Sequence, residues 1–276
     1  MIDPAITQNL IYTKNGFWIS PKISNVSYPE DVHRYLFPVE ENSFWFQHRN
    51  DCIVEILHRF PPKEYIIDVG GGNGYVSLGI QNAGFKVIML ESGPDGVMNA
   101  QKRGIKDILH TTFQDANFPD SCVDSIGLFD VLEHIKDDHA FLTLASRCMK
   151  KEGRLYITVP AHRYLWSWMD VKGGHFRRYS IALLTKRLNK SGFEVKYASY
   201  FFLGLSLPIF FSRTLPTLLR LPKNWSHEKR VKTHRKSIGF VGRIVDWHWK
   251  HEIRKLKTGK RFYGSSVIAV AEPIKP

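Results

Sequence analysis

The sequence predicts an α/β fold in which a mostly parallel sheet carries helices on both faces. The 276-residue chain is 43% hydrophobic and 13% aromatic, a composition typical of a packed globular core. From about Arg49 to Ser191, short apolar runs alternate with amphipathic stretches, as expected for parallel strands joined by crossover helices. A glycine cluster, GGGNG, directly follows the first apolar run. Such a turn after a strand is typical of nucleotide-binding sites.

Seven apolar runs are expected to form strands: 65–69, 86–90, 108–111, 125–129, 155–159, 193–200 and 265–271. The first helix is expected before them, where apolar residues from Ile53 to Phe60 recur at helical spacing until Pro61 and Pro62 end it. Four more helices are expected around 76–83, 96–103, 138–149 and 181–189. The last two strands are separated by a long insertion, 201–262.

Positive charge is concentrated in this insertion. The formal net charge of the chain is +13, and the segment from Arg213 to Arg261 holds 15 of the 39 Lys and Arg residues. An uncharged run, 197–212, precedes it and contains Pro208. The run is shorter than the roughly 20 residues that a membrane-spanning helix needs. The insertion is therefore interpreted as a helical cap over the substrate, as an element on an anionic membrane surface, or as a nucleic-acid interface.

The cysteines and the N-terminus indicate a cytoplasmic protein. Cys52, Cys122 and Cys148 lie far apart and form no CxxC pair, which is typical of buried thiols in a reducing compartment. No metal site is predicted. The N-terminus lacks the basic and apolar regions of a secretion signal.

The glycine turn fits neither of the two common phosphate-binding patterns. A third glycine at dinucleotide spacing is missing, and no G-K-[ST] follows. The residues instead read D-x-G-x-G-x-G, with Asp68, Gly70, Gly72 and Gly74. A carboxylate would repel a diphosphate, whereas it suits a ligand with a positive end, such as an ammonium or a sulfonium.

At this turn the sequence resembles the class I methyltransferases that use S-adenosylmethionine. The blocks VIMLESG, TTFQDANFPDSCVDSIGLFDVLEHIKD and MKKEGRLYITVPA follow in the order and at the distances of that family. The resemblance implies a seven-stranded Rossmann-like sheet with S-adenosylmethionine as cofactor. It also implies an N-terminal extension or lid over 1–45, a cofactor-binding core over 46–200, the insertion over 201–262, and a last strand with tail over 263–276.

The resemblance further implies which residues contact the cofactor. Glu91 is expected to bind the ribose hydroxyls, and Asp115 with Ala116 to lie on the adenine side. The full expected set is Asp68, Gly70, Gly71, Gly72, Gly74, Glu91, Ser92, Asp115, Ala116, Phe129 and Asp130. Trp45 and Arg49 are added as residues that close over the sulfonium and the methionine carboxylate. Their alternative role is to pack in the core under the first helix.

The acceptor is expected beside the stretch after the fifth strand, because ligands of open α/β sheets lie at the carboxyl ends of strands. His175 is predicted as a general base or as a group that orients the acceptor; alternatively it caps a helix or pairs with an acid. His134 is a second candidate base, which alternatively packs against the cofactor. The predicted substrate contacts are His162, Trp166, Arg177, Arg178 and Tyr179.

The predicted activity is methyl transfer by in-line displacement to a small-molecule, lipid-linked or glycan-linked acceptor. ENSFWFQHRN and PAHRYLWSWMDVKGGHFRRYS resemble a bacterial subgroup associated with glycan, lipid or secondary-metabolite pathways. The protein would then be cytoplasmic, with possible attachment to the inner face of the membrane through 201–262. A nucleic-acid-directed methyltransferase or binding module is the alternative. It is less favoured because the fourth strand ends in FDVLEH and lacks an Asn/Asp-Pro-Pro-aromatic run.

Overall fold

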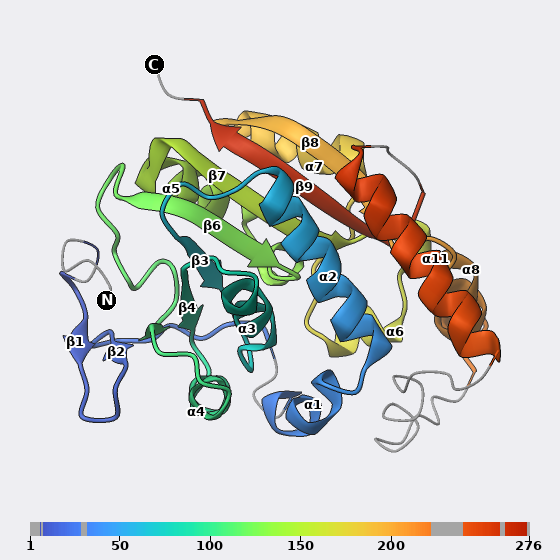
Figure 1. The fold of residues 1–276 in the computed structure, drawn as a ribbon, viewed down its shortest axis with the longest axis horizontal. Helices are drawn as coiled ribbons and strands as arrows, with labels where there is room; N and C mark the ends of the chain where they lie inside the picture. Colours follow the sequence, from blue (N-terminus) through green and yellow to red (C-terminus); the bar gives the residue numbers. More distant parts are fainter. Residues whose placement is uncertain (1–5, 7, 29–31, 222–239, 260–262, 275–276) are drawn as a thin grey trace.

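The structure contains a single mixed sheet flanked by helices (Figure 1). It is a computed structural model that describes residues 6, 8–28, 32–221, 240–259 and 263–274. In these residues nine strands form the order β1-β2-β5-β4-β3-β6-β7-β9-β8. The strands are β1 (Ile11–Tyr12), β2 (Trp18–Ile19), β3 (Ile66–Val69), β4 (Val87–Glu91), β5 (Ile108–His110), β6 (Val123–Phe129), β7 (Met149–Pro160), β8 (Phe193–Phe201) and β9 (Ser266–Pro273).

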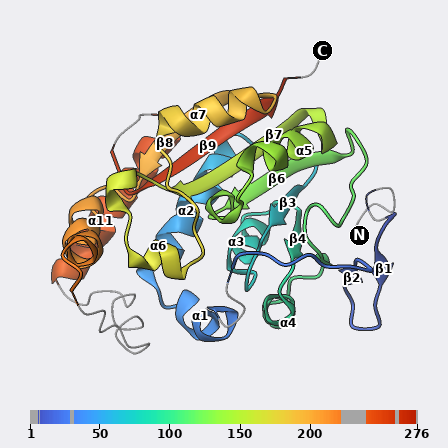
Figure 2. The ribbon, with the colours of Figure 1, turned by 180° about the vertical axis from the view of Figure 1, so that it is seen from behind.

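The helices cover both faces of the sheet, as expected. They are α1 (Val32–Glu40), α2 (Phe44–Arg59), α3 (Tyr75–Asn82), α4 (Pro94–Lys102), α5 (Asp138–Cys148), α6 (Trp168–Lys172), α7 (Ile181–Lys190), α8 (Ser206–Ile209), α9 (Leu215–Leu218) and α11 (Phe240–Lys257), with short segments η2 (Leu132–His134), η3 (Arg163–Leu165) and the π-helical η4 (Phe210–Thr214). Helices α2, α3 and α11 lie on the face seen in Figure 1. Helices α5 and α7 lie on the opposite face (Figure 2).

Successive side chains of a strand point to opposite faces of the sheet, so each face has its own part of the hydrophobic core. In β3, Ile66 packs in the cluster that contains α2 and α3, while its neighbour Ile67 packs in the cluster that contains α5 and α7. Both side chains are fully buried. A strand whose side chains are buried on both faces reads as a continuous apolar run, which is why the sequence revealed it.

The prediction of seven strands was wrong in number. The seven expected strands are present as β3 to β9, but the sheet also contains β1 and β2, which form an antiparallel hairpin. Strand β2 extends the sheet by pairing in parallel with β5. Two-residue strands are too short to show a period, so only their contacts with β5 reveal them. Strand β9 runs antiparallel between β7 and β8, which makes the sheet mixed.

The chain between β8 and β9 is mostly helical where it is described. Segments α8, η4 and α9 follow one another from Ser206 to Leu218, and α11 leads back to β9. Helix α11 packs on α2, where the ring of His48 lies 2.7 Å from the Glu252 carboxylate. The basic run 229–236 lies outside the described residues. Among the described residues, no helix combines the length and apolar character needed to cross a bilayer.

Candidate active site

The glycine turn joins the end of β3 to α3, at the edge where the parallel strands end. Gly72 has a φ of +57°, and the nearest atom to a Cβ built there is a ring carbon of His33, 3.9 Å away. Gly74 has a φ of +77°, and a Cβ there would lie 2.8 Å from the Cβ of Ala100 in α4. Glycine is therefore required at Gly74 for both backbone conformation and packing, whereas Gly72 leaves space above the turn.

Two acids flank this turn, as predicted. Asp68 is buried and accepts a hydrogen bond of 2.6 Å from the Ser77 hydroxyl. Burial raises the pKa of Asp68 to about 6, against the opposing effects of Ser77 and Arg49. Glu91, at the end of β4, accepts hydrogen bonds from the backbone N–H groups of Gly72 at 2.8 Å and Gly93 at 2.7 Å. Each Glu91 oxygen keeps a second lone pair for a hydroxyl donor.

Arg49 already pairs with a second predicted cofactor residue. Its guanidinium donates to the carboxylate of Asp130, which also accepts a 3.3 Å hydrogen bond from the Thr158 hydroxyl. The buried Nε of Arg49 has no hydrogen-bond partner among the described residues. The ring of Trp45 stacks on that of Phe202 at 5.4 Å between centroids. The guanidinium of Arg49 lies 4.8 Å from the centroid of the Trp45 ring. A buried, unpaired donor fits an anionic group such as a carboxylate.

The residues expected on the adenine side are held by other parts of the chain. The carboxylate of Asp115 accepts hydrogen bonds from the backbone N–H of Ser24 at 2.7 Å and from the Thr112 hydroxyl at 2.6 Å. Burial would raise the pKa of Asp115, but these hydrogen bonds outweigh it and lower the pKa. Ala116 and Phe129 are buried in the core. The carbonyl of Ser92 accepts a hydrogen bond of 3.1 Å from His110.

Helix α1 lies against the glycine turn, a contact that the sequence did not reveal. The amide nitrogen of Asn73 donates to the carbonyl of His33 and to the carboxylate of Glu40, both at 3.1 Å. Arg103 donates to the same Glu40 at 2.6 Å. Just before α1, the ring of Tyr28 lies 5.2 Å from that of His33. The N-terminal segment thus packs against the residues expected to hold the cofactor.

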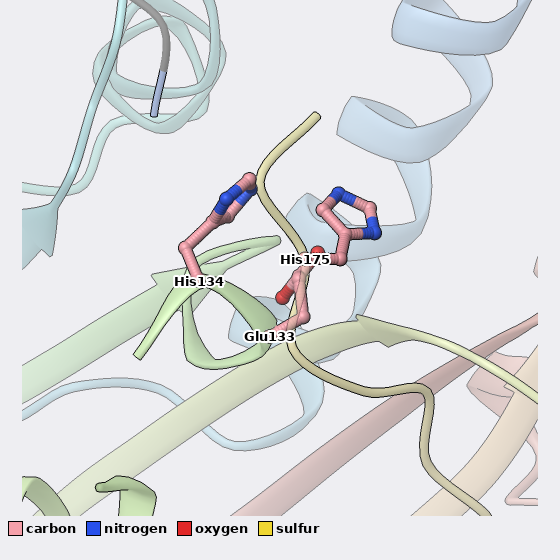
Figure 3. Close-up of side chains that lie close together, drawn as sticks. All are labelled: Glu133, His134 and His175. Carbon is pink, nitrogen blue, oxygen red and sulfur yellow. The ribbon is translucent and has the colours of Figure 1, made fainter. Parts of the chain in front are cut away.

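The side chains of Glu133, His134 and His175 lie close together after the end of β6 (Figure 3). One ligand atom from each of Glu133, His134 and His175 lies within 4.8 Å of the other two. The rings of His134 and His175 meet edge to face at 4.6 Å, and Tyr28 contacts His134 at 5.3 Å. Burial and the neighbouring His175 lower the pKa of His134 to about 3, so His134 is neutral at physiological pH.

A buried acid orients His175. Asp170, in α6, lies 3.2 Å from the Nδ1 of His175 and accepts a 2.7 Å hydrogen bond from Arg178. Burial would raise the pKa of Asp170, but the hydrogen bonds from His175, Arg178 and Ser167 and the charge of Arg178 lower it to about 2. An ionised Asp170 favours the tautomer of His175 with the proton on Nδ1, in which Nε2 can accept a hydrogen bond or bind a ligand. His175 therefore pairs with an acid, which was the alternative interpretation of this residue.

The other predicted substrate contacts have structural partners. Arg177 donates to the carbonyls of Ile135 at 2.7 Å and Lys136 at 2.6 Å. The prediction for Tyr179 conflicts with its position, because its side chain is fully buried and its hydroxyl donates to Asp138 at 3.0 Å. Arg178 is likewise occupied with Asp170. These two residues shape the loop that carries His175.

His162 and Trp166 lie at the other end of this loop. The ring of His162 stacks on Tyr200 at 4.7 Å, and its Nε2 lies 3.0 Å from the carbonyl of Gly264. Burial lowers the pKa of His162. Trp166 is half-buried at the end of η3. Both therefore lie after β7, but neither belongs to the cluster in Figure 3.

Comparison with known proteins supports one family. A family model described as "Methyltransferase domain" matches residues 44–198, more than half of the chain. A probable S-adenosylmethionine-dependent methyltransferase of Mycolicibacterium smegmatis is 26% identical over 182 residues, covering 65% of this chain and 70% of that protein.

Solved structures support the fold. A SAM-dependent methyltransferase from Archaeoglobus fulgidus has a TM-score of 0.50 at 17% identity, covering 81% of this chain and 94% of the other. Phosphoethanolamine N-methyltransferase 2 of Haemonchus contortus, solved with S-adenosyl-L-methionine, has a TM-score of 0.55 at 15% identity, covering 90% and 58%. The chain belongs to the class I S-adenosylmethionine-dependent methyltransferases, and S-adenosylmethionine is its cofactor.

Proposed function

We propose that this protein methylates a lipid-linked or otherwise amphiphilic acceptor at an anionic membrane surface. The cofactor supplies a methyl group that its positive sulfur has already activated. The protein must therefore align the acceptor with that group, and alignment alone accounts for roughly 7–11 kcal/mol of such a barrier. Asp68, the glycine turn and Glu91 would hold the adenosyl end, and Arg49 the carboxylate. His175, oriented by Asp170, would orient the acceptor.

The observation that carries this proposal is an exposed apolar face on α8, η4 and α9. Leu207, Phe211 and Leu218 are 69%, 62% and 66% exposed, respectively. These three residues follow one another along the helical segment from Ser206 to Leu218. Leu219 and Leu221 extend this apolar face at 59% and 49% exposure. Several exposed large apolar side chains on one segment favour contact with a membrane or a partner, because their exposure to water is costly.

Positive charge on α11, which contacts the chain just before α8, favours an anionic membrane as the partner. Helix α11 contacts the chain just before α8, where His248 lies 3.0 Å from the carbonyl of Leu203. Lys250, Arg254 and Lys257 are exposed on α11. Each cation near an anionic leaflet contributes about 1 kcal/mol to binding. An apolar face with adjacent cations is the arrangement of interfacial membrane elements.

The apolar face is also connected to the acceptor side of the site. The Thr217 hydroxyl of α9 accepts a hydrogen bond of 3.2 Å from the backbone N–H of Trp168. Trp168 begins α6, the helix that carries Asp170. A membrane bound at α8 to α9 would thus lie next to the loop of His175. The nucleic-acid alternative would use the basic insertion 201–262, of which residues 222–239 and 260–262 lie outside the described residues.

Flotation with lipid vesicles tests this proposal. The full chain should float with vesicles of phosphatidylglycerol and phosphatidylcholine, and less with phosphatidylcholine alone. The double change Phe211→Ser and Leu218→Ser should reduce the floating fraction at least tenfold. Ile11→Ser is a matched control, because Ile11 is 62% exposed on β1. Flotation that is absent, or unchanged in the double variant, would contradict the membrane proposal.

A further inference from the structure

We propose that Glu133, His134 and His175 form a binding site for one divalent metal ion. The three residues come from two segments, η2 and the loop after α6, that converge at the end of β6 (Figure 3). The backbone N–H of Phe176 donates a 2.8 Å hydrogen bond to the carbonyl of Glu133 and joins the two segments. This backbone hydrogen bond holds the two segments that carry the three side chains next to each other.

The distances suit a metal centre. The three ligand atoms lie within 4.8 Å of one another. Ligands bound at about 2.0–2.2 Å in tetrahedral geometry are about 3–4 Å apart. Small side-chain rotations would therefore bring all three atoms onto one ion.

Two of the three ligands have an unsatisfied atom. The Oε2 of Glu133 and the Nδ1 of His134 are buried and have no hydrogen-bond partner among the described residues. Glu133 is only 1% exposed, so water compensates little for the missing partner. Leaving a buried polar atom unpaired costs about 1–3 kcal/mol. A cation between these atoms would satisfy both.

The third ligand is already oriented as metal-binding histidines are. Asp170 holds the Nδ1 of His175 at 3.2 Å, which leaves Nε2 as the free nitrogen. A carboxylate that fixes the far nitrogen of a histidine is the usual support of a metal ligand. Arg49 and Arg178 bring positive charge nearby, but each pairs with an acid of its own, Asp130 and Asp170.

The ligand set indicates the kind of metal. Two imidazole nitrogens and one carboxylate oxygen favour Zn²⁺, Mn²⁺ or Fe²⁺ over Mg²⁺ and Ca²⁺, which prefer oxygen ligands. Three protein ligands leave a position open, as in catalytic zinc sites. An acceptor hydroxyl at that position would lose its proton more readily. This role rests on the proposed function and selects an oxygen acceptor; metal binding itself does not depend on it.

Calorimetric titration of the full chain with Zn²⁺, after treatment with a chelator and without acceptor, tests the site. We expect one ion per chain and at least tenfold weaker binding of Mg²⁺. Glu133→Gln and His175→Ala should each weaken Zn²⁺ binding at least tenfold. His139→Ala is the control, because His139 is exposed and bonded to Ser191 outside the cluster. Circular dichroism of each variant should show that it remains folded.

Cobalt(II) provides a second readout that needs no activity. Co²⁺ bound at the site should give a visible absorption band that Glu133→Gln weakens and His175→Ala abolishes. Equal Zn²⁺ affinity in the wild type and both variants would overturn the proposal, as would no tight binding in any of them. A chain that binds S-adenosylmethionine and floats with vesicles, yet takes up no zinc, would overturn the metal site alone.

Discussion

At the scale of single residues, the two acids that flank the glycine turn lie in different environments. Glu91 accepts hydrogen bonds from two backbone N–H groups, whereas Asp68 is buried beside Ser77. Asp68 was singled out by the D-x-G-x-G-x-G pattern, and Glu91 by its place at the end of the second strand together with the family resemblance. Glu133 and Asp170 were not predicted, because their importance comes from contacts with His175 and not from any local pattern.

Asp68 should make stability depend on pH in the absence of cofactor. Its pKa of about 6 in the folded protein exceeds the ordinary value of 3.8, so the fold favours the neutral form. The stability that this preference contributes is complete below about pH 4 and is lost as the pH rises through 6. Relative to Asp68→Asn, the wild type should lose up to about 3 kcal/mol of unfolding free energy between pH 4 and 7.

Urea denaturation at several pH values measures this difference. The Asp68→Asn variant is a suitable reference, because its side chain can still accept the hydrogen bond of Ser77 and does not titrate. Other titrating groups contribute equally to both proteins and cancel. A difference between the two proteins that stays constant from pH 4 to 7 would show that Asp68 is not perturbed.

At the scale of elements, local signals predicted the helices and strands of the core but not how the peripheral elements pack. The start of α7 matches the prediction, whereas α2 begins at Phe44, well before the expected Ile53; Ser43 caps α2 by accepting a hydrogen bond from Phe46, and Ser180 caps α7 by accepting one from Leu183. Helix α11 differs, because its position depends on Glu252, an acid buried against α2. A buried acid in a basic segment does not follow the apolar periodicity that sequence analysis uses.

Removing Glu252 should loosen α11. The Glu252 carboxylate lies 2.7 Å from the His48 ring nitrogen and accepts the backbone N–H of Leu203 at 3.1 Å. Glu252→Ala leaves both groups buried without an acceptor and should cost about 3–5 kcal/mol of unfolding free energy. Urea denaturation measures this cost. Asp246→Ala, on the exposed side of the same helix, should change stability by less than about 0.5 kcal/mol. Equal effects of the two changes would contradict the role given to Glu252.

At the scale of the whole molecule, the carboxyl ends of the parallel strands bring together the predicted cofactor residues and the cluster of Glu133, His134 and His175. The parallel direction of β3 to β7 follows from the alternation of strands and helices, which the sequence displays. The N-terminal contacts do not, because Ser24, His33 and Glu40 meet residues far away in sequence. The same holds for the exposed apolar face, since only the packed structure shows which residues of 206–221 remain uncovered.

Calorimetric titration with S-adenosylmethionine tests most directly whether the carboxyl ends of these strands hold the cofactor. The wild type should bind one molecule per chain, and Glu91→Ala should bind at least tenfold more weakly, because Gly72 and Gly93 lose their acceptor. Glu152→Ala removes an acid whose side chain is 68% exposed and should bind like the wild type. Equal affinity of the wild type and Glu91→Ala, or binding of NAD with no binding of S-adenosylmethionine, would contradict the account.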